Sequence, residues 1–143
     1  MKKTILSTLA ALLLFHSAWT QKDSSGVYKT AADFSSKTLS YAINCKEERH
    51  KINPNLLFNS TQIKVKHGGT IYMLKKSETF GYKACDGATY RFVNNSDYKL
   101  LNPTEGLLLY EYQHPAHAPK NAEQYKVMYF FSNGADEPVQ ALT

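Results

Sequence analysis

The chain has 143 residues, a formal net charge of +5 and 43% hydrophobic residues, a size and composition typical of one folded domain. Its basic residues are scattered singly and in pairs rather than lined along one segment. This mild and dispersed charge argues against nucleic acid as a partner, because nucleic-acid binding needs a concentrated basic surface.

The N-terminus has the features of a signal peptide over residues 1–20. Lys2 and Lys3 precede an apolar run from Ile5 to Phe15, and small or polar residues follow it up to a predicted cleavage before Gln21. The run is far shorter than the ~20 apolar residues that span a bilayer, so we expect no transmembrane anchor after cleavage. We therefore predict a periplasmic or secreted protein, with a mobile leader over residues 21–26 and one domain over residues 27–143.

One short helix is expected near the start of this domain. Thr30 and Asp33 have the spacing of a capping box, in which each side chain accepts a hydrogen bond from the other residue's backbone N–H. This predicts a helix that begins after Thr30 and ends at about Lys37.

The rest of the chain has the pattern of short strands, in which apolar and polar residues alternate between turn residues. The predicted segments are 39–43, 63–65, 70–74, 79–84, 88–94, 98–101, 107–113 and 125–132. The turns between them are too short for parallel crossovers. We expect an all-β fold, a single antiparallel meander that forms a sandwich or a barrel.

The hairpin around Asp86 can be placed in register. A two-residue loop would put Arg91 opposite Tyr82 on an aromatic face, whereas a three-residue loop from Cys85 to Gly87 pairs Tyr82 with Tyr90. We predict the second register, with Gly87 in the left-handed position of a bulge. Phe80, Tyr82, Ala84, Ala88, Tyr90 and Phe92 then form an apolar face, and Lys83, Thr89 and Arg91 share the solvated face.

Cys45 and Cys85 are the only two cysteines. An even number of cysteines in an exported chain favours a disulfide, and the alternative is two unpaired thiols. The two residues lie far apart in the chain, without the C-x-x-C spacing of redox enzymes, so we expect no catalysis by cysteine.

No motif of a catalytic or metal centre stands out. His114 and His117 have a spacing that zinc sites use, but no cysteine or carboxylate cluster lies nearby in sequence, and we predict no metal and no cofactor. Nucleophile elbows and H-E-x-x-H helices are missing. The favoured hypothesis is a non-catalytic module that binds an envelope protein or a glycan; the alternative is a small hydrolase with a site assembled from distant residues such as His50, His67 and a turn carboxylate.

Two segments are apolar on both strand faces. Leu107 and Leu109 alternate with Leu108, Tyr110 and Tyr112, while Met128 and Phe130 alternate with Tyr125, Val127, Tyr129 and Phe131. Either these strands are covered on both sides, which is the commoner reason for apolar residues, or one face binds a partner. For the second case the predicted binding residues are Leu107, Leu109, Met128 and Phe130.

Three strings of residues resemble a family of small exported proteins of Gram-negative bacteria, a domain of unknown function. They are Gly26 to Thr30 followed by Asp33-Phe34, Gly81 to Gly87, and Tyr90-Arg91-Phe92. The resemblance covers most of the chain after the signal peptide and implies no catalytic residues. Chains of that family continue into a helical tail beyond the segment that is similar to Gln140–Thr143.

Overall fold

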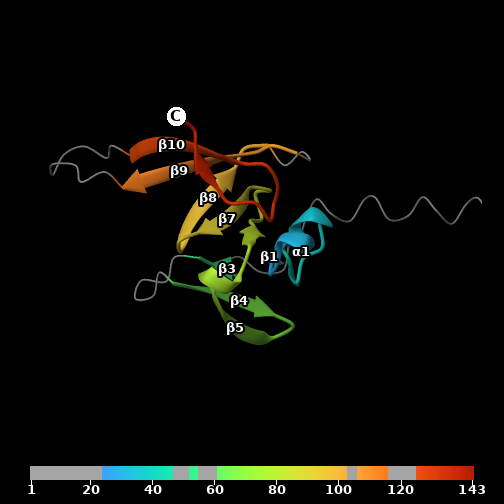
Figure 1. Ribbon diagram of the computed structural model, residues 1–143. Helices are drawn as coiled ribbons and strands as arrows, with labels where there is room; N and C mark the ends of the chain where they lie inside the picture. The colour runs from blue at the N-terminus through green and yellow to red at the C-terminus, as the bar shows by residue number, and fades with distance from the viewer. Residues whose placement is uncertain (1–23, 47–51, 55–60, 103–105, 116–124) are drawn as a thin grey trace, which may run out of the picture.

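The computed structural model describes residues 24–46, 52–54, 61–102, 106–115 and 125–143 (Figure 1). Over these residues the chain folds into one large and one small antiparallel sheet, with one short α-helix. The predicted all-β antiparallel fold is therefore confirmed. No helix in these ranges has the length and apolar character needed to cross a membrane.

The large sheet has the strand order β11-β10-β9-β8-β7-β6-β1-β2. Its strands are β1 (Ser24–Tyr28), β2 (Tyr41–Asn44), β6 (Gly81–Lys83), β7 (Thr89–Val93), β8 (Ser96–Leu100), β9 (Leu108–Pro115), β10 (Tyr125–Ser132) and β11 (Gln140–Ala141). From β6 to β11 each strand pairs with its neighbour in sequence, as in a meander. Strand β1 departs from this order, because it lies between β2 and β6.

The small sheet contains β3 (Ile52–Asn53), β4 (Gln62–His67) and β5 (Thr70–Lys75) in the order β3-β4-β5. The 3₁₀ helix η1 (Lys76–Glu78) then leads from β5 back to the large sheet. In Figure 1 the small sheet lies at one end of the molecule, and β9 and β10 lie at the other.

The ordered domain begins earlier than the sequence predicts. Strand β1 starts at Ser24, and both Ser25 and Gly26 are buried. Residues 24–26, which the sequence assigned to a mobile leader, therefore belong to β1: all three pair with β2, and Gly26 also pairs with Lys83 of β6. The predicted signal peptide and residues 21–23 lie outside the described residues.

The predicted hairpin register is confirmed for β6 and β7, but Phe80 does not share the face of Tyr82 and packs instead against Phe34 and Arg91. Tyr82 pairs with Tyr90, Gly81 pairs with Arg91, and Gly87 has a φ of 89°. The rings of Tyr82 and Tyr90 stack with centroids 4.9 Å apart, as expected for side chains that face each other across a ladder. The predicted solvated environment of Arg91 is wrong, because its side chain lies half-buried among residues of β9, β10 and the C-terminal segment.

Each face of the large sheet has its own core. One face packs against the small sheet through a buried cluster of Val27, Ile43, Ile63, Val65, Tyr82 and Phe92. The opposite face carries a second cluster of Leu100, Leu108, Tyr110 and Ala135, against which Phe34 and Val139 pack. The second core is thus covered by the helix and the C-terminal segment rather than by a sheet.

The helix α1 (Ala31–Ser35) forms as its sequence predicts but is shorter. The backbone N–H of Asp33 donates to Thr30 Oγ1 at 3.1 Å, and the N–H of Thr30 donates to Asp33 Oδ2 at 3.0 Å. Lys37, with a φ of 56°, turns the chain away just after the helix. Phe34 anchors α1 to the sheet by stacking on Phe80, with ring centroids 4.8 Å apart.

Cys45 and Cys85 form a disulfide, with Cα atoms 5.7 Å apart. Cys45 directly follows β2 and Cys85 lies in the loop between β6 and β7. The bond therefore joins two turns at the same end of the large sheet and resolves the choice between a disulfide and free thiols.

Candidate binding surfaces

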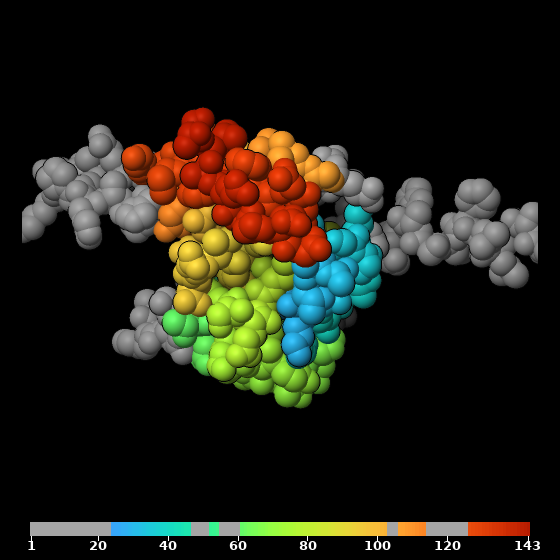
Figure 2. All heavy atoms as spheres, in the orientation of Figure 1, coloured from blue at the N-terminus to red at the C-terminus, as the bar shows by residue number. Residues whose placement is uncertain are grey.

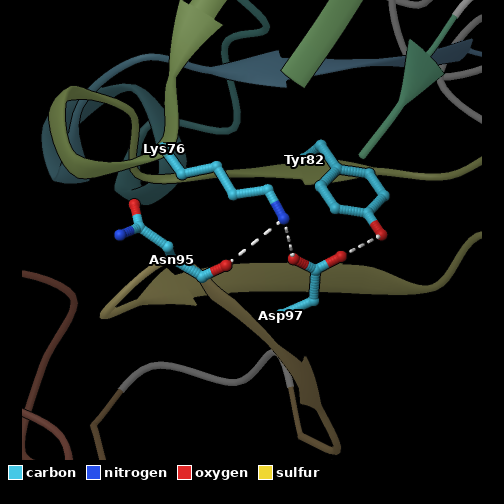
Figure 3. A network of polar contacts seen from close by, with 4 residues as sticks. All are labelled: Lys76, Tyr82, Asn95 and Asp97. Atoms are coloured by element: carbon cyan, nitrogen blue, oxygen red, sulfur yellow. Dashed lines mark hydrogen bonds and ion pairs between the residues drawn. The ribbon is translucent and has the colours of Figure 1, made fainter. Parts of the chain in front are cut away.

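A buried lysine links the small sheet to the large one (Figure 3). The Lys76 ammonium donates to Asp97 Oδ1 at 2.9 Å and to the Asn95 carbonyl at 3.3 Å, and its side chain is only 3% exposed. The Tyr82 hydroxyl donates to Asp97 Oδ2 at 3.2 Å, so both carboxylate oxygens are occupied. Burial, together with the charge of Asp97, raises the pKa of Tyr82 well above the ordinary tyrosine value. These contacts describe a structural tie rather than an acid and base exposed to a substrate.

Arg91 makes a second tie, on the opposite face of the sheet. Its guanidinium donates to the Tyr110 hydroxyl at 3.1 Å, to Ser132 Oγ at 3.2 Å and to the Glu137 carbonyl at 2.9 Å. The group also lies over the Phe80 ring, 5.1 Å from its centroid. Arg91 thereby fixes the segment after β10 against the sheet.

A pocket of about 560 Å³ opens between this C-terminal segment and α1. Figure 2 shows the two chain regions that border it, the C-terminal residues in red beside the N-terminal residues in blue. The floor is the sheet face that carries Tyr28 and Lys83, and the walls include Phe34 and Leu39 on one side and Ala135 on the other. The volume lies within the range of roughly 300–1,000 Å³ that small-molecule sites have.

The pocket exists because small residues face it where a core would have large ones. Ser24, Gly87 and Thr89 line its sheet side, and Gly134 lines its C-terminal side. The five-residue helix α1 contributes Phe34 and Ser35 to the lining. The result is a hollow whose lining mixes apolar and polar side chains.

The charged side chains that line the pocket are Lys37, Lys83 and Asp136. Lys37 follows α1, Lys83 belongs to β6, and Asp136 lies in the C-terminal segment.

A second feature, the apolar strip, consists of Leu101, Val127, Tyr129 and Leu142. Their exposed fractions are 45%, 43%, 49% and 57%. Leu142 joins the strip because its backbone N–H donates to the Tyr129 carbonyl at 2.9 Å, which continues the pairing of β10 with β11.

The register shows which face of the sheet carries the strip. Tyr129 pairs with Glu111, Glu111 with Lys99, and Lys99 with Tyr90. Paired residues share a face, so Tyr129 lies on the face of Tyr90, which packs against the core of the small sheet. The small sheet therefore covers this face at β1, β2, β6 and β7 but leaves it open at β9 and β10.

The four predicted binding residues do not form one surface. Phe130 pairs with Tyr110 and Met128 with Tyr112, which places both on the face of the second core, where they are half-buried. Leu109 pairs with Phe131 on the opposite face, and Leu107, 50% exposed, precedes β9. Val127 and Tyr129 are exposed on β10 but were not among the predicted binding residues. Their alternation with Met128 and Phe130 already placed them on the other face of the strand.

Of the two histidines in the hydrolase hypothesis, His50 and His67, only His67 lies among the described residues. His67, at the end of β4, has its Nδ1 2.7 Å from the Ala42 carbonyl oxygen and its ring edge-on to Tyr41. His50 and His117 lie outside the described residues, as does the side chain of His114. Among the described residues, no group of three or more His, Cys, Asp or Glu side chains is arranged to hold a metal.

No family model, curated protein or solved structure matches the chain. The resemblance to small exported proteins of Gram-negative bacteria therefore stays a prediction.

Proposed function

We propose that the protein is an exported, non-catalytic binding module that holds another protein on its apolar strip. Export is supported by the signal-peptide pattern in the sequence and by the disulfide between Cys45 and Cys85, since disulfides persist in oxidising compartments. The compartment we propose is the periplasm or the surrounding medium.

The observation that carries the proposal is the open face of β9 and β10. Sheet faces with large apolar side chains are normally buried, and contiguous exposed ones commonly mark interaction sites. On this sheet the same face is buried where the small sheet covers it and exposed at Val127 and Tyr129. Lys99 and Glu111 provide the polar groups beside the strip.

The composition of the strip favours a protein over a glycan. Sugars are held by aromatic platforms with polar groups, whereas three of the four strip residues are aliphatic and only Tyr129 is aromatic. Aliphatic and aromatic residues together, surrounded by polar ones, are typical of protein interfaces.

The test is an affinity capture with tagged protein from the periplasm and outer membrane of its own cells, read by mass spectrometry against a tag-only control. We expect one stoichiometric protein partner, and we expect its loss with the double variant Val127→Lys and Tyr129→Lys. The matched control is Lys126→Thr, an exposed change on the same strand but on the other face. Equal capture by all three proteins, or capture of no protein at all, would contradict the proposal.

A further inference from the structure

The outer face of the small sheet combines lysines with exposed apolar residues. Between β4 and β5, Lys64 pairs with Met73 and Lys66 pairs with Ile71, and paired residues share a face. Ile71 is 54% exposed, Met73 is 47% exposed, and both lysines are exposed as well. These four residues, which we name the basic face, therefore lie side by side on two neighbouring strands.

The basic face points away from the large sheet. Ile63 and Val65, which alternate with the two lysines along β4, are fully buried in the core that joins the small sheet to the large one. Successive side chains of a strand point to opposite faces, so Lys64 and Lys66 point outward. Figure 1 shows the small sheet at the lower end of the molecule, with the large sheet above it. The large sheet thus lies behind the basic face and does not cover it.

The charges of the basic face are not offset within the described part of the chain. Neither Lys64 nor Lys66 forms an ion pair with any residue there. Lys75, a third lysine on the same side of β5, already pairs with Glu78 at 2.9 Å. The face therefore presents two cations and two apolar side chains together.

We propose that the basic face docks the protein on an anionic phospholipid bilayer. The ammonium groups of the lysines lie against lipid phosphates, while Ile71 and Met73 enter the boundary between headgroups and acyl chains. Lysines beside exposed apolar residues are typical of surfaces that bind anionic membranes. A protein partner fits less well, because lysine is depleted in protein interfaces. The basic face shares no residue with the apolar strip, so the inference goes beyond the protein-binding function and does not depend on it.

The test is co-sedimentation of the purified protein with sucrose-loaded vesicles. One set of vesicles is made of phosphatidylcholine alone, and the other of equal parts of phosphatidylcholine and phosphatidylglycerol, so that the two differ in surface charge. We expect binding to the anionic vesicles at least about tenfold tighter than to the neutral ones. This binding should weaken as salt is added, because salt screens exposed charges.

Two double variants locate the contact. Lys64→Gln with Lys66→Gln should weaken binding to anionic vesicles at least about tenfold, since each lysine near such a surface contributes about fivefold. Ile71→Thr with Met73→Thr keeps the charges but removes apolar surface, and should weaken binding about threefold to tenfold. All four positions are exposed, and circular dichroism checks that each variant is folded.

The matched control removes two exposed charges from the large sheet instead. Lys99→Gln with Lys126→Gln changes the net charge by the same amount, on β8 and β10. Because these lysines lie outside the basic face and salt screens distant charges, vesicle affinity should stay within about twofold of the wild type.

Several outcomes overturn the inference. They are no binding to anionic vesicles at low salt, equal binding to neutral vesicles, unchanged binding in either basic-face variant, or an equal loss in the control. A protein captured by the wild type but not by the Lys64 and Lys66 variant, without any vesicle binding, would assign the face to an acidic protein and overturn the inference as well. The same variant should still capture the partner of the apolar strip, so a failure here is distinguishable from a failure of the protein-binding function.

Discussion

Replacing Lys76 by methionine tests whether the buried tie of Figure 3 holds the two sheets together. Methionine keeps an apolar chain near the Phe92 ring, whose centroid lies 5.1 Å from the ammonium nitrogen, but removes the charge. Removing one partner of a buried ion pair costs about 3–5 kcal/mol. Asp97 is 18% exposed and keeps its bond from Tyr82, so we expect the lower end, about 3 kcal/mol.

The neighbouring residue is a matched control for this change. Lys75 also forms a salt bridge of 2.9 Å, to Glu78, but the two side chains are 61% and 67% exposed. Exposed pairs contribute little to stability, so Lys75→Met should unfold at the wild-type midpoint. The two variants thus remove the same charge from adjacent positions, one buried and one exposed.

The assay is urea denaturation followed by circular dichroism, with thermal unfolding as a second measurement. We expect Lys76→Met to lower the melting temperature by about 10 °C and Lys75→Met to leave it unchanged. Equal effects of the two substitutions would refute the reasoning, because they would show that burial does not govern the strength of this pair. A double variant Lys76→Met and Asp97→Leu should recover part of the loss, since it leaves no buried charge unpaired.

Three further results are expected. Replacing Cys45 and Cys85 by serine removes a disulfide whose cysteines are 40 residues apart, and should lower the free energy of unfolding by about 4 kcal/mol. Urea denaturation measures this loss, with the reduced wild-type protein as the comparison. Burial and the charge of Asp97 raise the pKa of Tyr82 in the folded state, so the unfolded chain loses this proton first as pH rises. The free energy of unfolding should therefore fall above about pH 10, by about 1.4 kcal/mol per pH unit. Urea midpoints that do not change above pH 10, or a pH dependence that is the same in Tyr82→Phe, would count against this. Gly81→Ala places a Cβ against the Tyr90 carbonyl oxygen and should lower the free energy of unfolding by about 3 kcal/mol or more. In Gly134→Ala the nearest atom to the new Cβ is a side-chain oxygen 3.4 Å away, so this variant should melt at the wild-type temperature.

Local chemistry made part of the fold predictable. The Cys85 to Gly87 loop fixed the hairpin register, because a one-residue shift would have moved Arg91 to the aromatic face. Thr30 and Asp33 predicted the start of α1, because both partners of the capping box lie within one turn of the helix. In each case the deciding interactions join residues that are close in sequence.

The remainder depended on contacts between distant residues. Ser24 to Gly26 have the composition of a linker, yet they belong to β1, an interior strand of the sheet in which Gly26 permits close approach to β2. Lys76 is buried because Asp97 meets it from another strand. Which face of β9 and β10 stays open is decided by how far the small sheet extends, and alternation within one strand carries no information about that.

The position of β1 has a consequence for the order of folding. Val27 pairs with Tyr41 and also with Tyr82, so the first strand made is completed only by residues synthesised much later. Closing so long a stretch of chain costs loop entropy before the pairing repays it, and such high contact order slows folding. We therefore expect the nascent chain to acquire its native sheet only after the β6–β7 hairpin has been made, with the bond between Cys45 and Cys85 forming as that hairpin docks.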